Sequence, residues 1–142
     1  MCIRDSNLGN DAIDVSGSDI KVQQVIITKA GDKGLSAGES STLYAEKVLI
    51  KESEIGVASK DKSTIQMRDC SLQYNNLGFT AFQKKSEFGS AAILADSIEM
   101  TNNQLVHLLE KGSIIRLNGQ EMEASDKVKE RMYGVEFGAS SQ

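Results

Sequence analysis

Apolar and polar residues alternate along this chain in short runs, and the runs recur with a fixed spacing of 22 residues. Four positions open the recurring phrases A-I-D-V, G-L-S-A, G-V-A-S and G-F-T-A, and they are Ala12, Gly34, Gly56 and Gly78. Alternation between apolar and polar residues is typical of strands rather than helices. A fixed period of this length predicts a solenoid, in which each repeat buries its apolar face against its neighbours.

Each repeat predicts three short strands, separated by turns that are rich in Gly, Ser, Asp, Asn and Lys. The second coil shows the pattern, with apolar pairs at Leu35 and Ala37, at Leu43 and Ala45, and at Val48 and Ile50. The chain is therefore predicted to be all-β, a parallel β-helix of about five coils over residues 9–123. Like residues should stack in interior ladders, Val25, Val48, Cys70 and Ile98 in one and Ile27, Ile50, Leu72 and Met100 in another. In such a ladder Cys70 is a small core residue rather than a nucleophile.

The two ends depart from the repeat. Residues 1–8 do not fit it, and the opening M-C-I-R-D-S resembles the translated adapter of an assembled metagenomic fragment, so we expect a non-native or linker start there. From Ser125 to Tyr133 the pattern predicts a short helix that caps the core, with Ser125 as N-cap and Gly134 as the stop, so 124–134 is taken as a capping helix and 135–142 as a mobile tail.

Composition narrows the possible functions. A net charge of −4 and a pI near 5.0 argue against a nucleic-acid partner. No apolar run reaches the roughly 18 residues that a membrane span needs. Two cysteines are too few for a disulfide framework, and a single histidine, His107, leaves no His-rich metal site. We therefore expect no cofactor, no metal and no membrane span.

The repeat resembles the right-handed parallel β-helix of the pectin-lyase-like superfamily. The phrases G-D-K-G-L-S-A-G-E-S-S (31–41), I-G-V-A-S-K-D-K-S (55–63) and A-F-Q-K-K-S-E-F-G (81–89) resemble uncharacterised bacterial surface-associated β-helix domains. The resemblance implies that a lyase or hydrolase site would use outward positions of the first strand, which here are Asp14, Ser36, Ala58, Thr80 and His107. Only one of these is a carboxylate, so neither paired catalytic acids nor a calcium site is present there. His107 has no acidic residue in register to orient it, so a catalytic role is not favoured.

A mixed-charge strip just after the first strand is the better candidate for binding. The 22-residue register stacks Lys60 beside Phe82 and Asp61 beside Gln83. The residues of the strip are Glu39, Lys60, Asp61, Phe82, Gln83, Lys84 and Lys85. Polar groups around an outward aromatic ring would suit a sugar ring or an acidic polysaccharide. The alternative is a set of exposed ion pairs that contribute little, with Phe82 and Phe88 folding the insertion down as a local cover. Tyr44, outward beside Gln66 and the column of Arg116, is a weaker candidate of the same kind.

The leading hypothesis is a non-catalytic structural or interaction domain at the C-terminal end of a larger exported or cell-surface bacterial protein. Its partners would be upstream coils or another domain of the same chain, and polysaccharide. Its location would be extracellular, periplasmic or at the cell surface. The alternative is the C-terminal remnant of a polysaccharide lyase or hydrolase whose catalytic coils lie upstream. Because function depends on sites added to a scaffold, the repeat alone does not choose between them.

Overall fold

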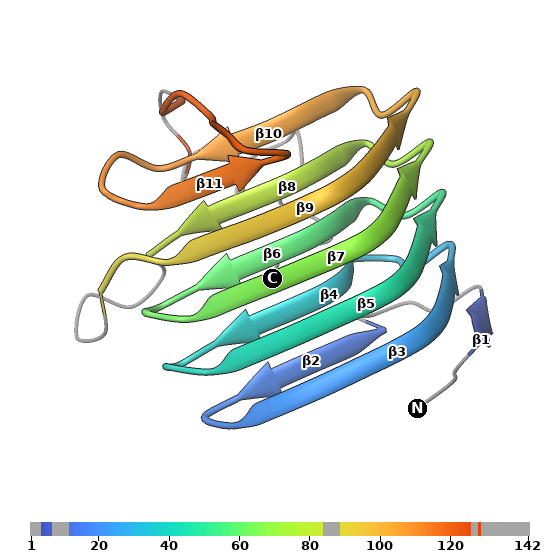
Figure 1. The fold of residues 1–142 in the computed structure, drawn as a ribbon, viewed down its shortest axis with the longest axis horizontal. Helices are drawn as coiled ribbons and strands as arrows, with labels where there is room; N and C mark the ends of the chain where they lie inside the picture. The colour runs from blue at the N-terminus through green and yellow to red at the C-terminus, as the bar shows by residue number, and fades with distance from the viewer. Residues whose placement is uncertain (1–3, 7–11, 84–88, 126–127, 129–142) are drawn as a thin grey trace.

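The computed structural model describes residues 4–6, 12–83, 89–125 and 128. The chain winds through two sheets in turn, so that short and long strands alternate along the sequence (Figure 1). The short strands form one parallel sheet in the order β10-β8-β6-β4-β2, with bounds Ile13–Ser16 (β2), Lys33–Gly38 (β4), Ile55–Lys60 (β6), Leu77–Phe82 (β8) and Leu105–Leu109 (β10). This is a β-solenoid of about five turns, which confirms the all-β prediction.

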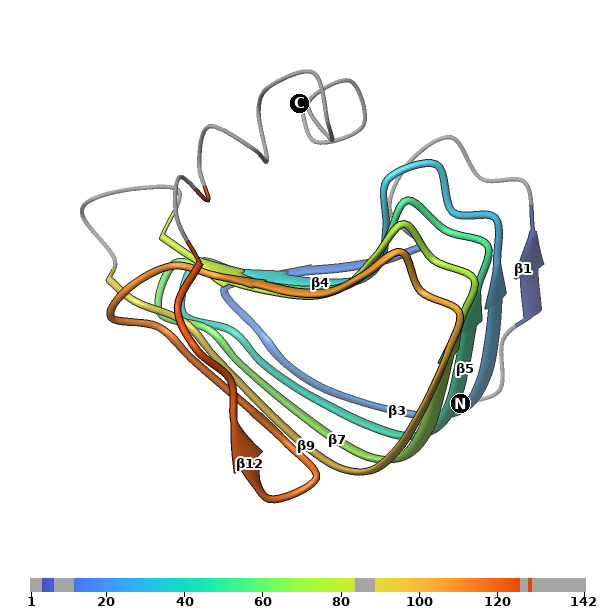
Figure 2. The same cartoon turned by 90° about the horizontal axis from the view of Figure 1, so that it is seen from above.

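The other sheet has seven strands in the order β1-β3-β5-β7-β9-β11-β12. Its strands are Arg4–Ser6 (β1), Asp19–Thr28 (β3), Thr42–Lys51 (β5), Thr64–Gln73 (β7), Ala92–Thr101 (β9), Ile114–Leu117 (β11) and Gln120–Glu121 (β12). All neighbours are parallel except β11 and β12, which form an antiparallel hairpin. Viewed from above, the coils lie nearly over one another and enclose a single interior (Figure 2).

Each ten-residue strand bends at its sixth residue. At that position Gln24, Lys47, Asp69 and Ser97 have left-handed backbone, with φ between 54° and 56°. The sequence predicted two short strands here, and the structure joins them into one bent strand. The bend explains why the alternation Leu43, Ala45 is followed by Val48 rather than by residue 47. The left-handed residue uses one extra position and returns the next side chain to the interior.

The interior is a stack of apolar ladders in the predicted register. Val25 pairs with Val48, Cys70 with Ile98, and Leu72 with Met100. The core contains Cys70, as predicted. The recurring glycines are explained by this stacking, because a Cβ on Gly56 would lie 2.7 Å from the carbonyl oxygen of Gly78 and 2.7 Å from Leu72 Cδ2. Gly34 faces the same obstacle one coil earlier.

Polar ladders run through the turns and satisfy backbone groups between coils. Asn75 is fully buried; its Oδ1 accepts from Ser53 N at 3.0 Å and its Nδ2 donates to Ile50 O at 3.2 Å. Asn103 repeats the arrangement one coil on, since its Oδ1 accepts from Asn75 N and its Nδ2 donates to Leu72 O. These side chains replace strand pairing where the chain turns, which is a structural role.

A second apolar cluster lies outside the coils, on the outer face of the short-strand sheet. Its buried members are Ile55, Ala58, Leu77, Phe82, Leu108 and Val128, with Leu105 packed against them. At the start of β4, Lys33 is buried with its Nζ 3.0 Å from both carboxylate oxygens of Asp32. The central short strands β4, β6 and β8 are therefore buried on both faces. The sequence did not predict this, because alternation in one sheet was interpreted as one buried face and one solvent face.

The last coil differs from the prediction in register and in its cap. Phe79 pairs with His107 and Ala81 with Leu109, whereas the sequence placed Val106 and Leu108 in those interior positions. The predicted capping helix over 124–134 and the tail over 135–142 lie mostly outside the described residues. Within them, residues 122–125 cross the end of the coil: Met122 N donates to Ile115 O, and Ser125 N donates to Leu109 O. The Ser125 hydroxyl accepts from Leu109 N.

The start of the chain joins the long-strand sheet. Arg4–Ser6 pairs in parallel with Ile26–Thr28 as β1, although the sequence predicted that residues 1–8 lie outside the repeat. Within the described part of the chain, no helix is long and apolar enough to cross a membrane.

Candidate functional site

The outward column of the short strands, where the resemblance places catalytic residues, is buried from β4 to β10 and exposed at Asp14 in β2. Its members in structural register are Asp14, Ser36, Ala58, Thr80 and Leu108. Ser36, Ala58, Thr80 and Leu108 are 0% exposed, and Ala58 and Leu108 belong to the second apolar cluster. The hydroxyls of Ser36 and Thr80 have no hydrogen-bond partner among the described residues. Hydroxyls in so dry a setting are poor candidates for acid–base chemistry, which requires access to substrate.

His107 was expected in this column, and that prediction was wrong by one residue. It occupies the interior column above Phe79, at the end of the solenoid, while Leu108 takes the outward place. Its Nε2 is 2.9 Å from the backbone carbonyl oxygen of Glu123, in the segment that crosses the last coil. This contact joins residues 122–125 to β10, so His107 has a structural role.

Three of the predicted strip residues do come together. Glu39, Lys60 and Asp61 line a hollow of about 110 Å³, with Asp14, Val15, Ser16 and Gly38 completing its wall. The Ser16 hydroxyl donates to Glu39 Oε2 at 2.7 Å. Sequence reasoning missed Asp14 and Ser16, although the pairing of Ser16 with Gly38 continues the same register into the first coil. Ligand sites are typically about 300–1,000 Å³, so this hollow is too small for a sugar ring.

Phe82 and Gln83, the other strip residues that the structure describes, do not extend this hollow toward a sugar. Phe82 points away from the coil interior as expected, but it is only 1% exposed and packs within the second apolar cluster. Its ring face is therefore not offered to a ligand. Gln83 N donates to Glu110 Oε1 at 2.9 Å, which links the end of β8 to the turn after β10. Lys84, Lys85 and Phe88 lie outside the described residues.

The outer face of the long strands offers a larger hollow around Tyr44. Its volume is about 290 Å³, and its lining residues are Tyr44, Gln66, Met67, Arg68, Leu94 and Asp96. Strand pairing brings them together, since Tyr44 pairs with Gln66, Gln66 with Leu94, and Arg68 with Asp96. Lys21 Nζ lies 5.3 Å from the centre of the Tyr44 ring, and the Tyr44 hydroxyl donates to Glu46 Oε2 at 3.5 Å. Here an aromatic ring stands beside amide, guanidinium and carboxylate groups that solvent can reach.

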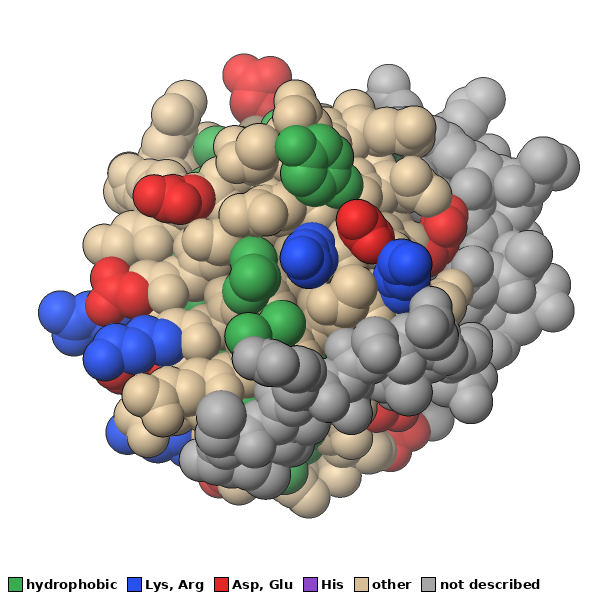
Figure 3. Space-filling model, turned by 90° about the vertical axis from the view of Figure 1, so that its right-hand side faces the viewer, with side chains coloured by type: hydrophobic (Ala, Val, Ile, Leu, Met, Phe, Trp, Pro, Cys, Tyr) green, Lys and Arg blue, Asp and Glu red, His purple; other side chains and the backbone are tan. Residues whose placement is uncertain are grey.

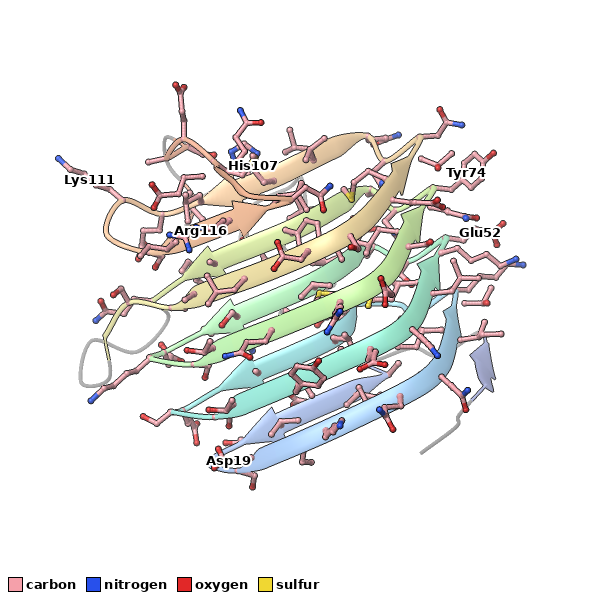
Figure 4. All side chains as sticks on the ribbon, viewed as in Figure 1. Asp19, Glu52, Tyr74, His107, Lys111 and Arg116 are labelled. Atoms are coloured by element: carbon pink, nitrogen blue, oxygen red, sulfur yellow. The ribbon has the colours of Figure 1, made fainter. Side chains whose placement is uncertain are left out.

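On the face shown in Figure 3, side chains of both charges are mixed. In Figure 3, Lys and Arg side chains stand among Asp, Glu and apolar side chains on one side of the solenoid. Figure 4 shows His107 and Arg116 on the last coils, and Tyr74 and Glu52 projecting from the turns that follow the long strands. Among the described residues, no group of three or more His, Cys, Asp or Glu side chains could hold a metal ion.

Cys70 is the remaining side chain with nucleophilic chemistry. Burial raises the pKa of its thiol, and the nearby charge of Asp69 raises it further, although backbone hydrogen bonds partly oppose this. Its Sγ donates to Arg68 O at 3.3 Å. A buried, protonated thiol is a weak nucleophile, since the thiolate is the reactive form.

Comparison with known proteins finds no matching family model, no matching curated protein and no matching solved structure.

Proposed function

We propose that this chain is a non-catalytic structural and interaction domain, a right-handed β-helix of the pectin-lyase-like kind that contacts polysaccharide. The observation that carries the proposal is the burial of the outward column in β4, β6, β8 and β10; its one carboxylate, Asp14 in β2, is exposed and has no second carboxylate in the column. A lyase or hydrolase on this scaffold would need its reacting groups in that column. Ser36, Ala58 and Thr80 are fully buried there, and the neighbouring outward residues Leu77 and Phe82 are apolar. A surface used in this way contributes stability rather than chemistry.

The Tyr44 hollow supports polysaccharide as the partner. A tyrosine ring offers an apolar face to the C–H face of a sugar, and the Tyr44 hydroxyl, which donates to Glu46, can still accept a hydrogen bond from a sugar hydroxyl. Gln66, Arg68 and Asp96 supply donors and acceptors at the height of such a ring. The hollow is open along parallel strands, which suits a long chain that lies on the surface rather than a small molecule that must be enclosed.

The open side of β3 supports a further coil of the same protein as a partner. Asp19–Gln23 pairs with β5 on one side, but β1 covers only Ile26–Thr28 on the other, so that side of Asp19–Gln23 has no partner strand among the described residues. Ile20, in this edge segment, is 41% exposed. A parallel coil supplied by the same protein would satisfy the edge and cover that side chain.

Affinity gel electrophoresis against neutral, acidic and amino-sugar polysaccharides tests the proposal. We expect at least one polysaccharide to retard the domain, and Tyr44→Ala to weaken its binding about tenfold, because a central aromatic contact is worth more than about 1.4 kcal/mol. Tyr74→Ala is the matched control, since Tyr74 is 55% exposed on a turn away from the hollow. Retardation by none of the polysaccharides, or equal binding by both variants, would contradict the proposal.

A further inference from the structure

A hollow larger than the Tyr44 hollow lies next to it, at the bends of β7 and β9. Its volume is about 510 Å³, and its lining residues are Asp69, Cys70, Ser71, Ser97, Ile98, Glu99 and Asn118. We call it the elbow hollow. Arg68 and Asp96 line the Tyr44 hollow, and the next residue along each strand, Asp69 and Ser97, lines the elbow hollow. The two hollows therefore follow each other along the same pair of strands.

The elbow hollow is built by the end of the strand ladder. β11 pairs with β9 only as far as Ala95, so the chain leaves the sheet beside the bend. Asn118 then replaces strand pairing at Ile98: its Oδ1 accepts from Ile98 N at 2.9 Å, and its Nδ2 donates to Ile98 O at 3.1 Å. Both ends of the amide are used, so this wall is fixed in place. The hollow is thus a consequence of the fold rather than of mobile side chains.

Its available chemistry is negative charge with hydroxyl groups. Asp69 and Glu99 are exposed, and neither carboxylate has a hydrogen-bond or ion-pair partner among the described residues. Cys70 and Ile98 form the buried floor, and the raised pKa of the Cys70 thiol keeps that floor uncharged. The hollow therefore presents two carboxylates over an uncharged base, a setting that attracts a cation and repels an anion.

Counting both hollows and the two charged side chains that contact Tyr44, four carboxylates (Glu46, Asp69, Asp96 and Glu99) stand against two cations, Lys21 and Arg68. Lys47 occupies the bend position one coil before Asp69, but it does not line the hollow. A polysaccharide made of acidic sugars would bring like charges together here. A unit that carries an ammonium group would instead find two acceptors with no competing ion pair among the described residues.

We propose that the elbow hollow is the subsite for an amino-sugar unit of an extended polysaccharide, whose neighbouring units lie over Tyr44. This inference rests on the proposed function and names its ligand class. It differs from the sequence-based expectation of an acidic polysaccharide, which depended on the lysines of the strip rather than on the outer face of the long strands.

The test compares oligosaccharides of equal length made of glucosamine, glucose and galacturonate, at a mildly acidic pH where the glucosamine amine is protonated. Isothermal titration calorimetry of the whole domain should give about tenfold tighter binding of the glucosamine oligomer than of the glucose oligomer, and weakest binding of the galacturonate oligomer. Asp69→Asn combined with Glu99→Gln should remove this preference, so that the glucosamine and glucose oligomers bind the variant with equal affinity. Asparagine tolerates the φ of 55° at position 69, so the bend should be retained.

Glu52→Gln is the control for a general change in charge, because Glu52 is exposed on a distant turn, and it should keep the preference. If the glucose and glucosamine oligomers bind equally and Tyr44→Ala weakens both, the amino-sugar subsite is refuted and the proposed function stands. If the galacturonate oligomer binds tightest, the charge argument is also refuted. If no oligosaccharide binds, the proposed function fails and this inference fails with it.

Discussion

Replacing Gly56 by alanine tests whether the 22-residue glycine spacing is a steric requirement of stacked coils. The new Cβ would lie 2.7 Å from Gly78 O and 2.7 Å from Leu72 Cδ2, both closer than real Cβ contacts. The carbonyl belongs to the strand of the next coil, so it cannot rotate away as the end of a flexible side chain could. Overpacking of this kind costs about 1–3 kcal/mol.

Gly38→Ala provides a matched control in the preceding short strand. Its Cβ would meet only Lys60 Cε, at 3.7 Å, which is an ordinary contact. Because Gly38 does not have positive φ, alanine there should be neutral or stabilise by about 0.4–1 kcal/mol, through the lower entropy of the unfolded chain.

Urea unfolding followed by circular dichroism measures both effects. With an m-value of about 2 kcal/mol/M, Gly56→Ala should lower the midpoint by about 0.5–1.5 M, while Gly38→Ala should leave it unchanged or raise it. Equal midpoints for the two variants would refute the steric explanation. The glycines would then mark only a backbone preference shared by all coils.

Two further substitutions test the buried parts of the fold. Asn75→Ala should destabilise the fold by about 1–3 kcal/mol for each backbone group that it leaves unpaired. Asn76→Ala is its control: it loses one partly buried hydrogen bond to Glu54 and should cost about 1 kcal/mol or less. Similar urea midpoints for the two variants would contradict a structural role of the asparagine ladder. Phe82→Ala should cost about 3–5 kcal/mol by opening the second apolar cluster, yet leave polysaccharide binding by the folded fraction unchanged. Lost binding at full stability would restore Phe82 as a ligand contact.

The bend of the long strands shows how far sequence pattern could reach. The interior residues Leu43, Ala45, Val48 and Ile50 are spaced by two, three and two positions. This spacing is enough to predict two straight segments with a change of direction between them. What the pattern did not indicate is that both segments belong to one continuous strand. A single left-handed residue at Lys47 turns the chain, and nothing about lysine as a residue type favours that conformation.

The register of the last coil could not be predicted for a different reason. The repeat is interrupted by an insertion of six residues before β9, and the following sequence L-V-H-L-L offers apolar side chains to both faces. In a strand, a slip of one residue exchanges the two faces. Here both faces are apolar, because the second cluster takes Leu108 and the interior takes Leu109, so hydrophobic pattern did not distinguish the two registers.

The candidate site illustrates the same limit. Tyr44, Gln66, Arg68 and Asp96 come from three strands, and their grouping follows from the 22-residue register, which the sequence contained. The sequence pattern did not predict how much of each outward side chain is exposed to solvent. The sequence placed the stronger candidate beside Phe82, which the fold buries, and the weaker one at Tyr44, which the fold leaves beside an open hollow.

The sequence by itself determined the repeat, the all-β solenoid and the interior ladders, because each depends on spacing along one strand and on stacking between identical coils. Only the tertiary structure decided which outward faces meet solvent. The outer face of the central short strands carries the second apolar cluster, and Val128 packs on it from beyond the regular repeats. Burial of an outward side chain depends on what packs over it from elsewhere in the chain, and no local period encodes that contact.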